Sequence, residues 1–193
     1  MVRRAPARPV ATLTLLAVVF GFYGVELAGD GSAICERWGL VPTHPTVAGL
    51  VASMALHDPS GWGHVLGNAL ALLVAGVAVE RVLGHWRVLA LFLVAGVAGA
   101  LAHVAADPSS TSALVGCSAS VFGLLGAMAL LYPRTVGFVA TLTAVNVWQT
   151  FAGTGGSVAV AAHCAGFAAG AVVTVLVFGQ RLAVARGWRR VPA

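Results

Sequence analysis

Four polar side chains lie inside apolar stretches of the sequence, and their types are those used in acyl transfer. Ser118 lies near the start of "LVGCSASVFGLLGAM", His163 lies at the start of a second apolar stretch, and His64 and Asn68 lie at the start of a third. A hydroxyl can act as a nucleophile, an imidazole as its base, and further donors can stabilise a developing oxyanion. The pattern predicts nucleophilic catalysis if the fold brings these residues together.

Each of these side chains also has a structural interpretation. Serine and other small residues let membrane helices approach closely, and a single histidine is often only a packing or hydrogen-bonding group. A strongly polar group in hydrocarbon nevertheless costs about 2–3 kcal/mol on insertion scales and usually marks function. His64 and Asn68 are four positions apart and share one helix face, as do Ser118 and Phe122. The combination favours the functional interpretation.

The composition shows what must position these residues. Hydrophobic residues make up 59% of the chain and charged residues 9%, with a mean hydropathy of +0.93. These values are typical of an integral membrane protein, not of a soluble domain. We expect one all-α domain over residues 1–193, a polytopic bundle with short basic cytoplasmic tails at about 1–9 and 180–193.

Six apolar runs are long enough to be membrane spans. The fifth is the shortest, because Asn146 and Gln149 interrupt it, and residues 29–60 are predicted to form a partly structured external loop. The six runs are Val10–Ala28, Gly61–Leu83, Val88–Ala106, Thr111–Tyr132, Val136–Phe151 and Val158–Gly179.

The arginines indicate the orientation of these spans. Ten of the eleven lie before the first span, between the second and third, after the fourth or after the sixth, all on one side. The positive-inside rule then predicts that both termini are cytoplasmic, in agreement with an even number of spans. The arginines are thus topology signals and not a nucleic-acid site. A cleaved signal peptide at the N-terminus is the alternative, which would leave five spans.

This topology places the polar residues at one depth. Even-numbered spans run from outside to inside, so His64, Ser118 and His163 lie in the outer third of the membrane. The six carboxylates lie at span ends or in loops, which excludes a protease with two intramembrane aspartates, and no His-Glu-x-x-His zinc motif occurs. The three cysteines form no disulfide or metal framework. A Ser-His dyad remains, unless Asp107 or Asp58 folds inward to complete a triad.

Three motifs in this order resemble the rhomboid intramembrane serine proteases. "GCSASVFG" is similar to the family's nucleophile motif, "HVLGN" to the His-x-x-x-Asn of its second helix, and "AHCAGFAAG" to the Ala-His-x-x-Gly-x-x-x-Gly of its sixth. "VERVLGHWR" is also similar to the family's cytoplasmic turn, and the resemblance extends from about His57 to Gly179.

The resemblance implies a role for each residue of these motifs. Ser118 would attack, His163 would activate it, and Phe122 would pack against His163. The oxyanion would be held by His64, Asn68 and main-chain amides near Ser118, and Gly166 and Gly170 would let the sixth helix approach the fourth. Two residues that precede the nucleophile, Gly116 and Cys117, belong to this expected site.

The sequence departs from the family pattern at two places. Ala119 replaces the usual glycine after the serine, and Ala48 and Gly49 lie where a Trp-Arg pair is common. The resemblance implies a serine endopeptidase that cleaves transmembrane helices of other proteins near their external ends, without metal or cofactor. The alternatives are an inactive rhomboid-like protein that binds membrane helices and a small transporter, although the chain lacks the midplane polar residues and internal symmetry expected of the latter. The lysine-free composition indicates a bacterial plasma membrane.

Overall fold

The chain folds into a bundle of helices, and the computed structural model describes residues 8–151 and 159–185. In this part of the chain the only extended pairing is an isolated bridge between Leu40 and Leu114, so the fold is all-helical. The helices are α1 (Val10–Ala28), α2 (Gly31–Trp38), α3 (Val47–Ala52), α4 (Trp62–Leu83), α5 (His85–Ala106), α6 (Ser118–Leu131), α7 (Val136–Phe151), α8 (Ala159–Leu176) and α9 (Gly179–Ala185), with a short 3-10 helix, η1 (Pro133–Thr135), before α7.

The length and composition of the helices are those of a membrane protein. Among the described residues, α1, α4 and α5 are long and apolar enough to cross a bilayer, and α6 and the stretch Val160–Leu176 of α8 are apolar but shorter. Large apolar side chains such as Leu70, Leu101 and Val172 are more than half exposed on the outside of the bundle. Such a surface suits lipid rather than water. Three of the six expected spans therefore meet the length requirement, and the count of six stays a prediction.

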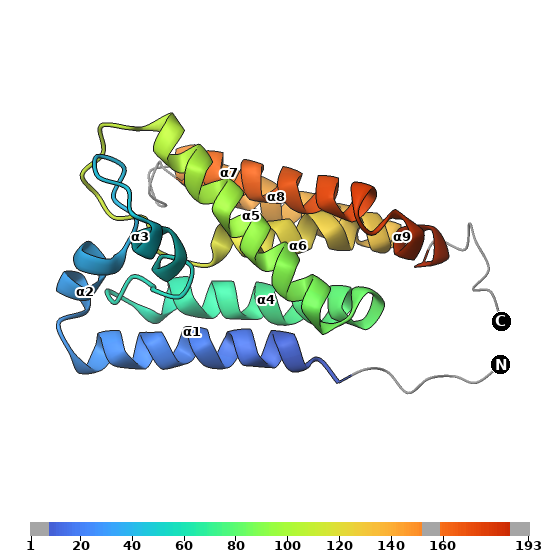
Figure 1. The fold of residues 1–193 in the computed structure, drawn as a ribbon, viewed down its shortest axis with the longest axis horizontal. Helices are drawn as coiled ribbons and strands as arrows, with labels where there is room; N and C mark the ends of the chain where they lie inside the picture. The colour runs from blue at the N-terminus through green and yellow to red at the C-terminus, as the bar shows by residue number, and fades with distance from the viewer. Residues whose placement is uncertain (1–7, 152–158, 186–193) are drawn as a thin grey trace.

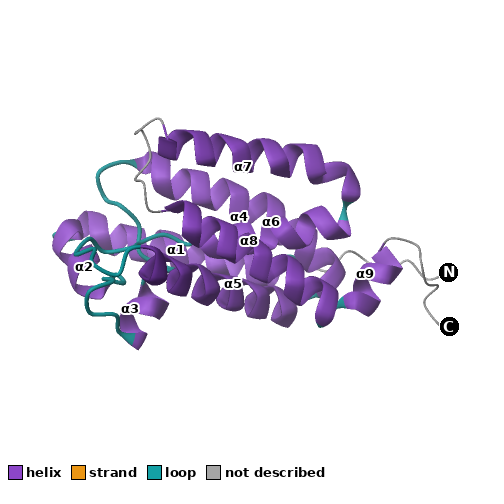
Figure 2. Ribbon diagram, turned by 90° about the horizontal axis from the view of Figure 1, so that it is seen from above, coloured by secondary structure: helices purple, strands orange, loops and turns teal. Residues whose placement is uncertain are grey.

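Helix α6 lies at the centre of the bundle. It contacts α4, α5 and α8, and α5 crosses obliquely over it (Figure 1). Residues 119–128 and Leu131 of α6 are all buried, as expected for a helix that is apolar all round. The view from above likewise places α6 among its neighbours, with α7 at the edge of the bundle (Figure 2). Any side chain at the start of α6 is thus held by three surrounding helices.

Glycines bring the backbones of α6 and α8 into contact. A Cβ atom added at Gly170 would collide with the backbone of Gly123, and one added at Gly166 would collide with the backbone of Ala119. Small residues in this spacing allow membrane helices to approach closely. The two glycines therefore set the distance between the helices that carry Ser118 and His163.

This packing gives a stability prediction for Gly170→Ala. The added methyl has no room beside Gly123, so we expect the variant to lose about 1–3 kcal/mol of unfolding free energy. Gly24→Ala in α1 is the matched control, because a Cβ atom there meets nothing within 4 Å. Thermal unfolding in detergent would measure both variants, and equal stability of Gly170→Ala and the unsubstituted protein would contradict the packing described here.

The expected span Thr111–Tyr132 is wrong at its start, because α6 begins only at Ser118. Leu114 donates its main-chain N–H to the carbonyl of Leu40 at 2.9 Å and accepts the Leu40 N–H at 3.1 Å, which holds this stretch extended. Gly116 then turns the chain with a φ of 116°, a conformation that residues with a Cβ rarely adopt. The pairing partner is far away in the sequence, so hydropathy alone missed it.

The connection between α1 and α4 is partly structured, as expected. Its two short helices, α2 and α3, lie at the same end of the bundle as the first residues of α4, α6 and α8, whereas α9 and the start of α1 lie at the opposite end (Figure 1). Ala48 and Gly49 belong to α3, and a Cβ atom at Gly49 would come within 2.7 Å of the carbonyl oxygen of Gly39. A small residue is therefore required at Gly49.

The buried carboxylate of Glu80 joins α1 to α4 at the opposite end of the bundle. Glu80 accepts the main-chain N–H groups of Ala11 and Thr12, each at 2.8 Å, and also bonds to the Thr12 hydroxyl and to His85. The first N–H groups of a helix have no acceptor within the helix, so Glu80 caps α1 from α4. This end of the bundle is held without any contribution from the residues expected to do chemistry.

Candidate active site

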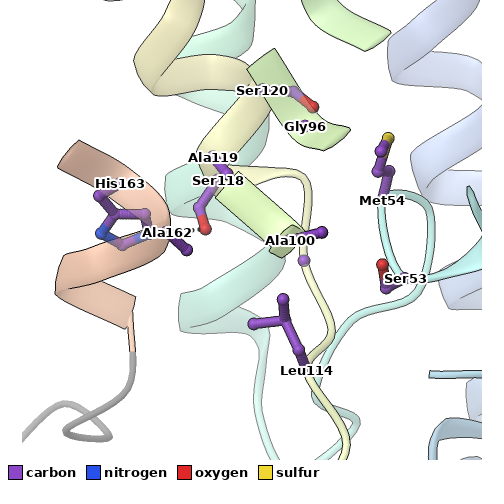
Figure 3. Close-up of a pocket in the computed structure, with 11 residues that line it drawn as sticks. Ser53, Met54, Gly96, Ala100, Leu114, Ser118, Ala119, Ser120, Ala162 and His163 are labelled. Atoms are coloured by element: carbon purple, nitrogen blue, oxygen red, sulfur yellow. Dashed lines mark hydrogen bonds between the residues drawn. The ribbon is translucent and has the colours of Figure 1, made fainter. Parts of the chain in front are cut away.

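Ser118 and His163 lie within hydrogen-bond distance of each other. Ser118 is the first residue of α6 and His163 lies in the first half of α8, and His163 Nε2 is 2.7 Å from Ser118 Oγ (Figure 3). His163 is 6% exposed. The distance is that of a nucleophile and its base. The two residues come from different helices, and the glycine contacts between α6 and α8 hold those helices together.

The ring of Phe122 lies flat against the imidazole of His163. The two ring centroids are 4.4 Å apart and the ring planes differ by only 8°. Phe122 is one turn after Ser118 on α6, so the same helix carries the hydroxyl and the platform for the imidazole. This stacking restricts the rotation of the His163 side chain.

His64 and Asn68 lie beside the residues that lead into α6. A Cβ atom added at Gly116 would be 2.8 Å from His64 Nε2 and 3.7 Å from Asn68 Nδ2. The main chain just before Ser118 therefore lies close to two side-chain nitrogens of α4, and the absence of a side chain at Gly116 leaves room for the His64 ring. Asn68 is 7% exposed, which keeps its amide away from bulk solvent.

Cys117, which the sequence predicts to be part of the oxyanion site, directs its side chain toward His57. The Cys117 side chain is fully buried, and its Sγ atom lies 3.7 Å from Nε2 of His57. Amide N–H groups in the first turn of α6 have no acceptor within the helix. They are the main-chain donors available next to Ser118.

The methyl group of Ala119 is accommodated by a glycine on α5. A Cβ atom added at Gly99 would collide with the Cβ of Ala119 and lie 2.7 Å from the carbonyl oxygen of Ala162. Gly99 thus leaves space for the side chain that departs from the family pattern. Ala119, where the family usually has glycine, therefore fits because the facing residue on α5, Gly99, has no side chain.

A cavity adjoins the Ser118–His163 pair. Its walls include Ser53, Met54, Gly96 and Ser120, and Figure 3 shows Ser120 directed toward Gly96 and Met54, whereas Ser118 is directed toward His163. Within the described residues, the buried Ser120 Oγ has no hydrogen-bond partner. Ser120 is therefore not arranged as a second nucleophile for His163.

The two candidate acids for a triad have other hydrogen-bond partners. Asp58 accepts the main-chain N–H of Ser60 at 2.9 Å, which lowers the pKa of its carboxyl. Asp107 accepts the hydroxyl of Ser109 at 3.1 Å. In the ranges that the structure describes, no group of three or more His, Cys, Asp or Glu residues is arranged to hold a metal ion.

Sequence reasoning missed His57 and Gly99 as parts of this site. His57 lies in the connection seven positions before His64 of α4, which is a weak signal because no single helix relates the two residues. Gly99 carried no signal at all, since its partner Ala119 is on another helix. Near the outer end of the short fifth apolar run, the sequence has Asn146, Trp148 and Gln149, which favour this helix as the movable side of a substrate entrance. Their side chains lie outside the described residues.

Comparison with known proteins gives the family. The Rhomboid domain family model matches residues 44–180. The chain is 30% identical over 142 residues to RHOMBOID-like protein 5 of Arabidopsis thaliana, covering 70% of this chain and 42% of that protein. It is 38% identical over 79 residues to Rhomboid protease GluP of Bacillus subtilis (strain 168), covering 41% of this chain and 15% of that protein.

The chain spans less than half the length of these curated relatives. The matched region nevertheless includes all four polar residues described above, together with the glycines that join α6 to α8. It also covers well over half of the present chain. The protein belongs to the rhomboid family.

Proposed function

We propose that this protein is an intramembrane serine endopeptidase that cleaves transmembrane helices of other proteins with Ser118 and His163. The observation that carries the proposal is the 2.7 Å distance between Ser118 Oγ and His163 Nε2 at the start of a buried helix. A protein that only binds membrane helices has no need of this pair. The same bundle is proposed to cross a bacterial plasma membrane six times, with both termini in the cytoplasm.

The proposed reaction proceeds through an acyl-enzyme. Ser118 Oγ attacks the carbonyl carbon of the scissile peptide bond while its proton passes to His163 Nε2. His163 then gives this proton to the leaving amine, the C–N bond breaks, and the acyl group stays on Ser118. A water molecule attacks the ester, His163 takes and returns the proton, and the carboxylic acid leaves.

The oxyanion of each tetrahedral intermediate needs donors in a site sheltered from water. His64 Nε2 and Asn68 Nδ2 lie near Gly116, and the first amides of α6 follow two residues later at Ser118. Donors fixed before the reaction stabilise the developing charge without reorganisation, which is usually a large part of catalysis. This arrangement supports a peptidase in preference to a helix-binding protein.

The position of the pair indicates the kind of substrate. Ser118 and His163 lie toward the end of the bundle that carries α2 and α3, which the arginine distribution assigns to the outside. A peptide bond in a helix is shielded, so the substrate must unwind near its external end, and each Gly or Pro there lowers the cost by about 1 kcal/mol or more. The clients are thus membrane proteins with weak helix formers near that end. The polar residues Asn146 and Gln149 of the short fifth apolar run favour α7 as the movable side of their entrance.

A reconstituted assay would test the proposal. The purified protein in lipid vesicles should react with a fluorophosphonate at Ser118 and cut a single-span reporter in or just outside the outer part of its span, next to a small residue. Mass spectrometry would identify the modified residue and both products, and Gly-to-Leu changes beside the cut should suppress cleavage. Stable binding of the reporter without any cleavage would support the helix-binding alternative, and a cytoplasmic cut would contradict the topology.

Replacement of the side-chain donors should slow turnover without removing the nucleophile. We expect Asn68→Ala and His64→Ala each to lower kcat by about one to three orders of magnitude, because each removes one oxyanion donor. Reaction of Ser118 with a small fluorophosphonate should persist in both. Aggregation of both variants in detergent, with labelling lost in proportion, would instead indicate that the two residues only support the fold.

A further inference from the structure

The main chain of His57 is fixed on both sides by other elements. Its N–H donates to Glu26 Oε1 in α1 at 2.9 Å, and its carbonyl accepts the thiol of Cys35 in α2 at 3.3 Å. Burial, together with the negative charges of Glu26 and Asp58, raises the pKa of Cys35 to about 11, so this thiol keeps its proton. Residue 57 is thus held in place although it lies outside any helix or strand.

The His57 ring has a defined tautomer. The side chain is fully buried, and Nδ1 lies 3.1 Å from the carbonyl oxygen of Ala55. A carbonyl oxygen only accepts, so Nδ1 must carry the proton. Burial, and to a smaller extent His64, lower the pKa of His57 to about 4, which keeps the ring neutral near neutral pH. Nε2 therefore presents a lone pair, and the atom it faces is Cys117 Sγ at 3.7 Å.

His64 has the opposite tautomer for a related reason. The main-chain N–H of Asp58, the residue after His57, donates to His64 Nδ1 at 3.4 Å. Nδ1 must then lack a proton, so neutral His64 carries its proton on Nε2, the atom that faces Gly116. The His57 and His64 rings lie side by side, with centroids 5.1 Å apart. The short segment 57–58 thus contacts both His64 of α4 and Cys117, the residue before α6.

We propose that His57 is a positioning residue of the oxyanion site. Its ring holds Cys117, the residue before the nucleophile, while the peptide that joins it to Asp58 keeps the proton of His64 on the nitrogen that faces the site. The inference rests on the proposed function and adds a residue that does not touch the substrate. It explains why a histidine is buried beside a cysteine where an apolar pair would pack equally well.

Loss of the His57 contact should affect the transition state more than the substrate complex. Small displacements of a catalytic group have large effects on rate, so we expect His57→Asn to lower kcat about tenfold with KM changed by less than about twofold. Asparagine keeps a donor for the Ala55 carbonyl but does not reach Cys117. Affinity for a peptide aldehyde, whose adduct with Ser118 places an oxygen in the oxyanion site, should fall in parallel with kcat.

The experiment uses the full chain in detergent or vesicles and includes a double-mutant cycle. Cys117→Ala removes the same contact from the other side, so the double variant should be no slower than the slower single variant. His44→Asn is the matched control, because His44 is an exposed histidine of the same connection and should leave kcat unchanged. Unfolding temperatures of all variants would be measured alongside.

NMR of the histidine ring nitrogens in the unsubstituted protein tests the same inference without relying on a variant that folds. We expect His57 to be protonated on Nδ1 and His64 on Nε2 at neutral pH. The reverse tautomer at either residue, additive effects in the cycle, or unchanged kcat in His57→Asn would overturn this inference alone. Absence of Ser118-dependent cleavage by the unsubstituted protein would overturn the proposed function and this inference with it.

Discussion

Ser118→Ala is expected to lower the rate of peptide-bond cleavage by about four orders of magnitude or more, to the background of the assay. The change removes the hydroxyl that lies 2.7 Å from His163 Nε2. The residual donors of the oxyanion site cannot replace an attacking oxygen. Cleavage of a single-span reporter in vesicles, followed as product per enzyme over time, would measure the effect.

Ser120→Ala is the matched control for this variant. Both changes remove one serine hydroxyl from the first turn of α6, but Ser120 Oγ is directed toward Gly96 and Met54 and has no partner within the described residues. Removal of a buried hydroxyl without a partner costs little and can stabilise the fold. Retained cleavage in Ser118→Ala, or a comparable loss in Ser120→Ala, would contradict the assignment of the nucleophile.

His163→Ala is expected to have an effect of similar size and, in addition, to suppress the reaction of Ser118 with a fluorophosphonate. Without the imidazole nothing takes the proton of Ser118 Oγ, so the hydroxyl stays a weak nucleophile. Active-site labelling measured beside reporter cleavage distinguishes this variant from the oxyanion variants, in which labelling persists. Labelling of His163→Ala at the unsubstituted rate would show that another group activates Ser118.

Phe122→Leu is expected to lower kcat by less than His163→Ala, because it removes only the ring that packs against His163. The stacked ring pair contributes about 0.5–1.5 kcal/mol beyond its buried area, so loss of the aromatic platform should lower kcat by roughly threefold to tenfold. The base itself remains in this variant. A loss as large as that of His163→Ala would indicate that Phe122 is needed for folding, and unfolding temperatures would show this directly.

The sequence by itself determined the class of the protein and the identity of its polar residues. Apolar runs and the few charges require a membrane bundle, because unpaired polar groups are too costly in hydrocarbon. The helical period alone places Phe122 one turn from Ser118, and Asn68 one turn from His64. These properties are local, so a single stretch of sequence is enough to indicate them. The motifs also indicated the family, which the comparison confirms.

Only the tertiary structure decided which atoms meet. The start of α6 at Ser118 depends on the pairing of Leu114 with Leu40, and the space for Ala119 depends on Gly99 of α5. His57 acquires its environment from α1, α2 and the side chain of Cys117 just before α6. These contacts join residues that are distant in the chain, and neither hydropathy nor helical period carries information about them. Long-range packing therefore fixes the geometry of the site, whereas the local sequence fixes its chemistry.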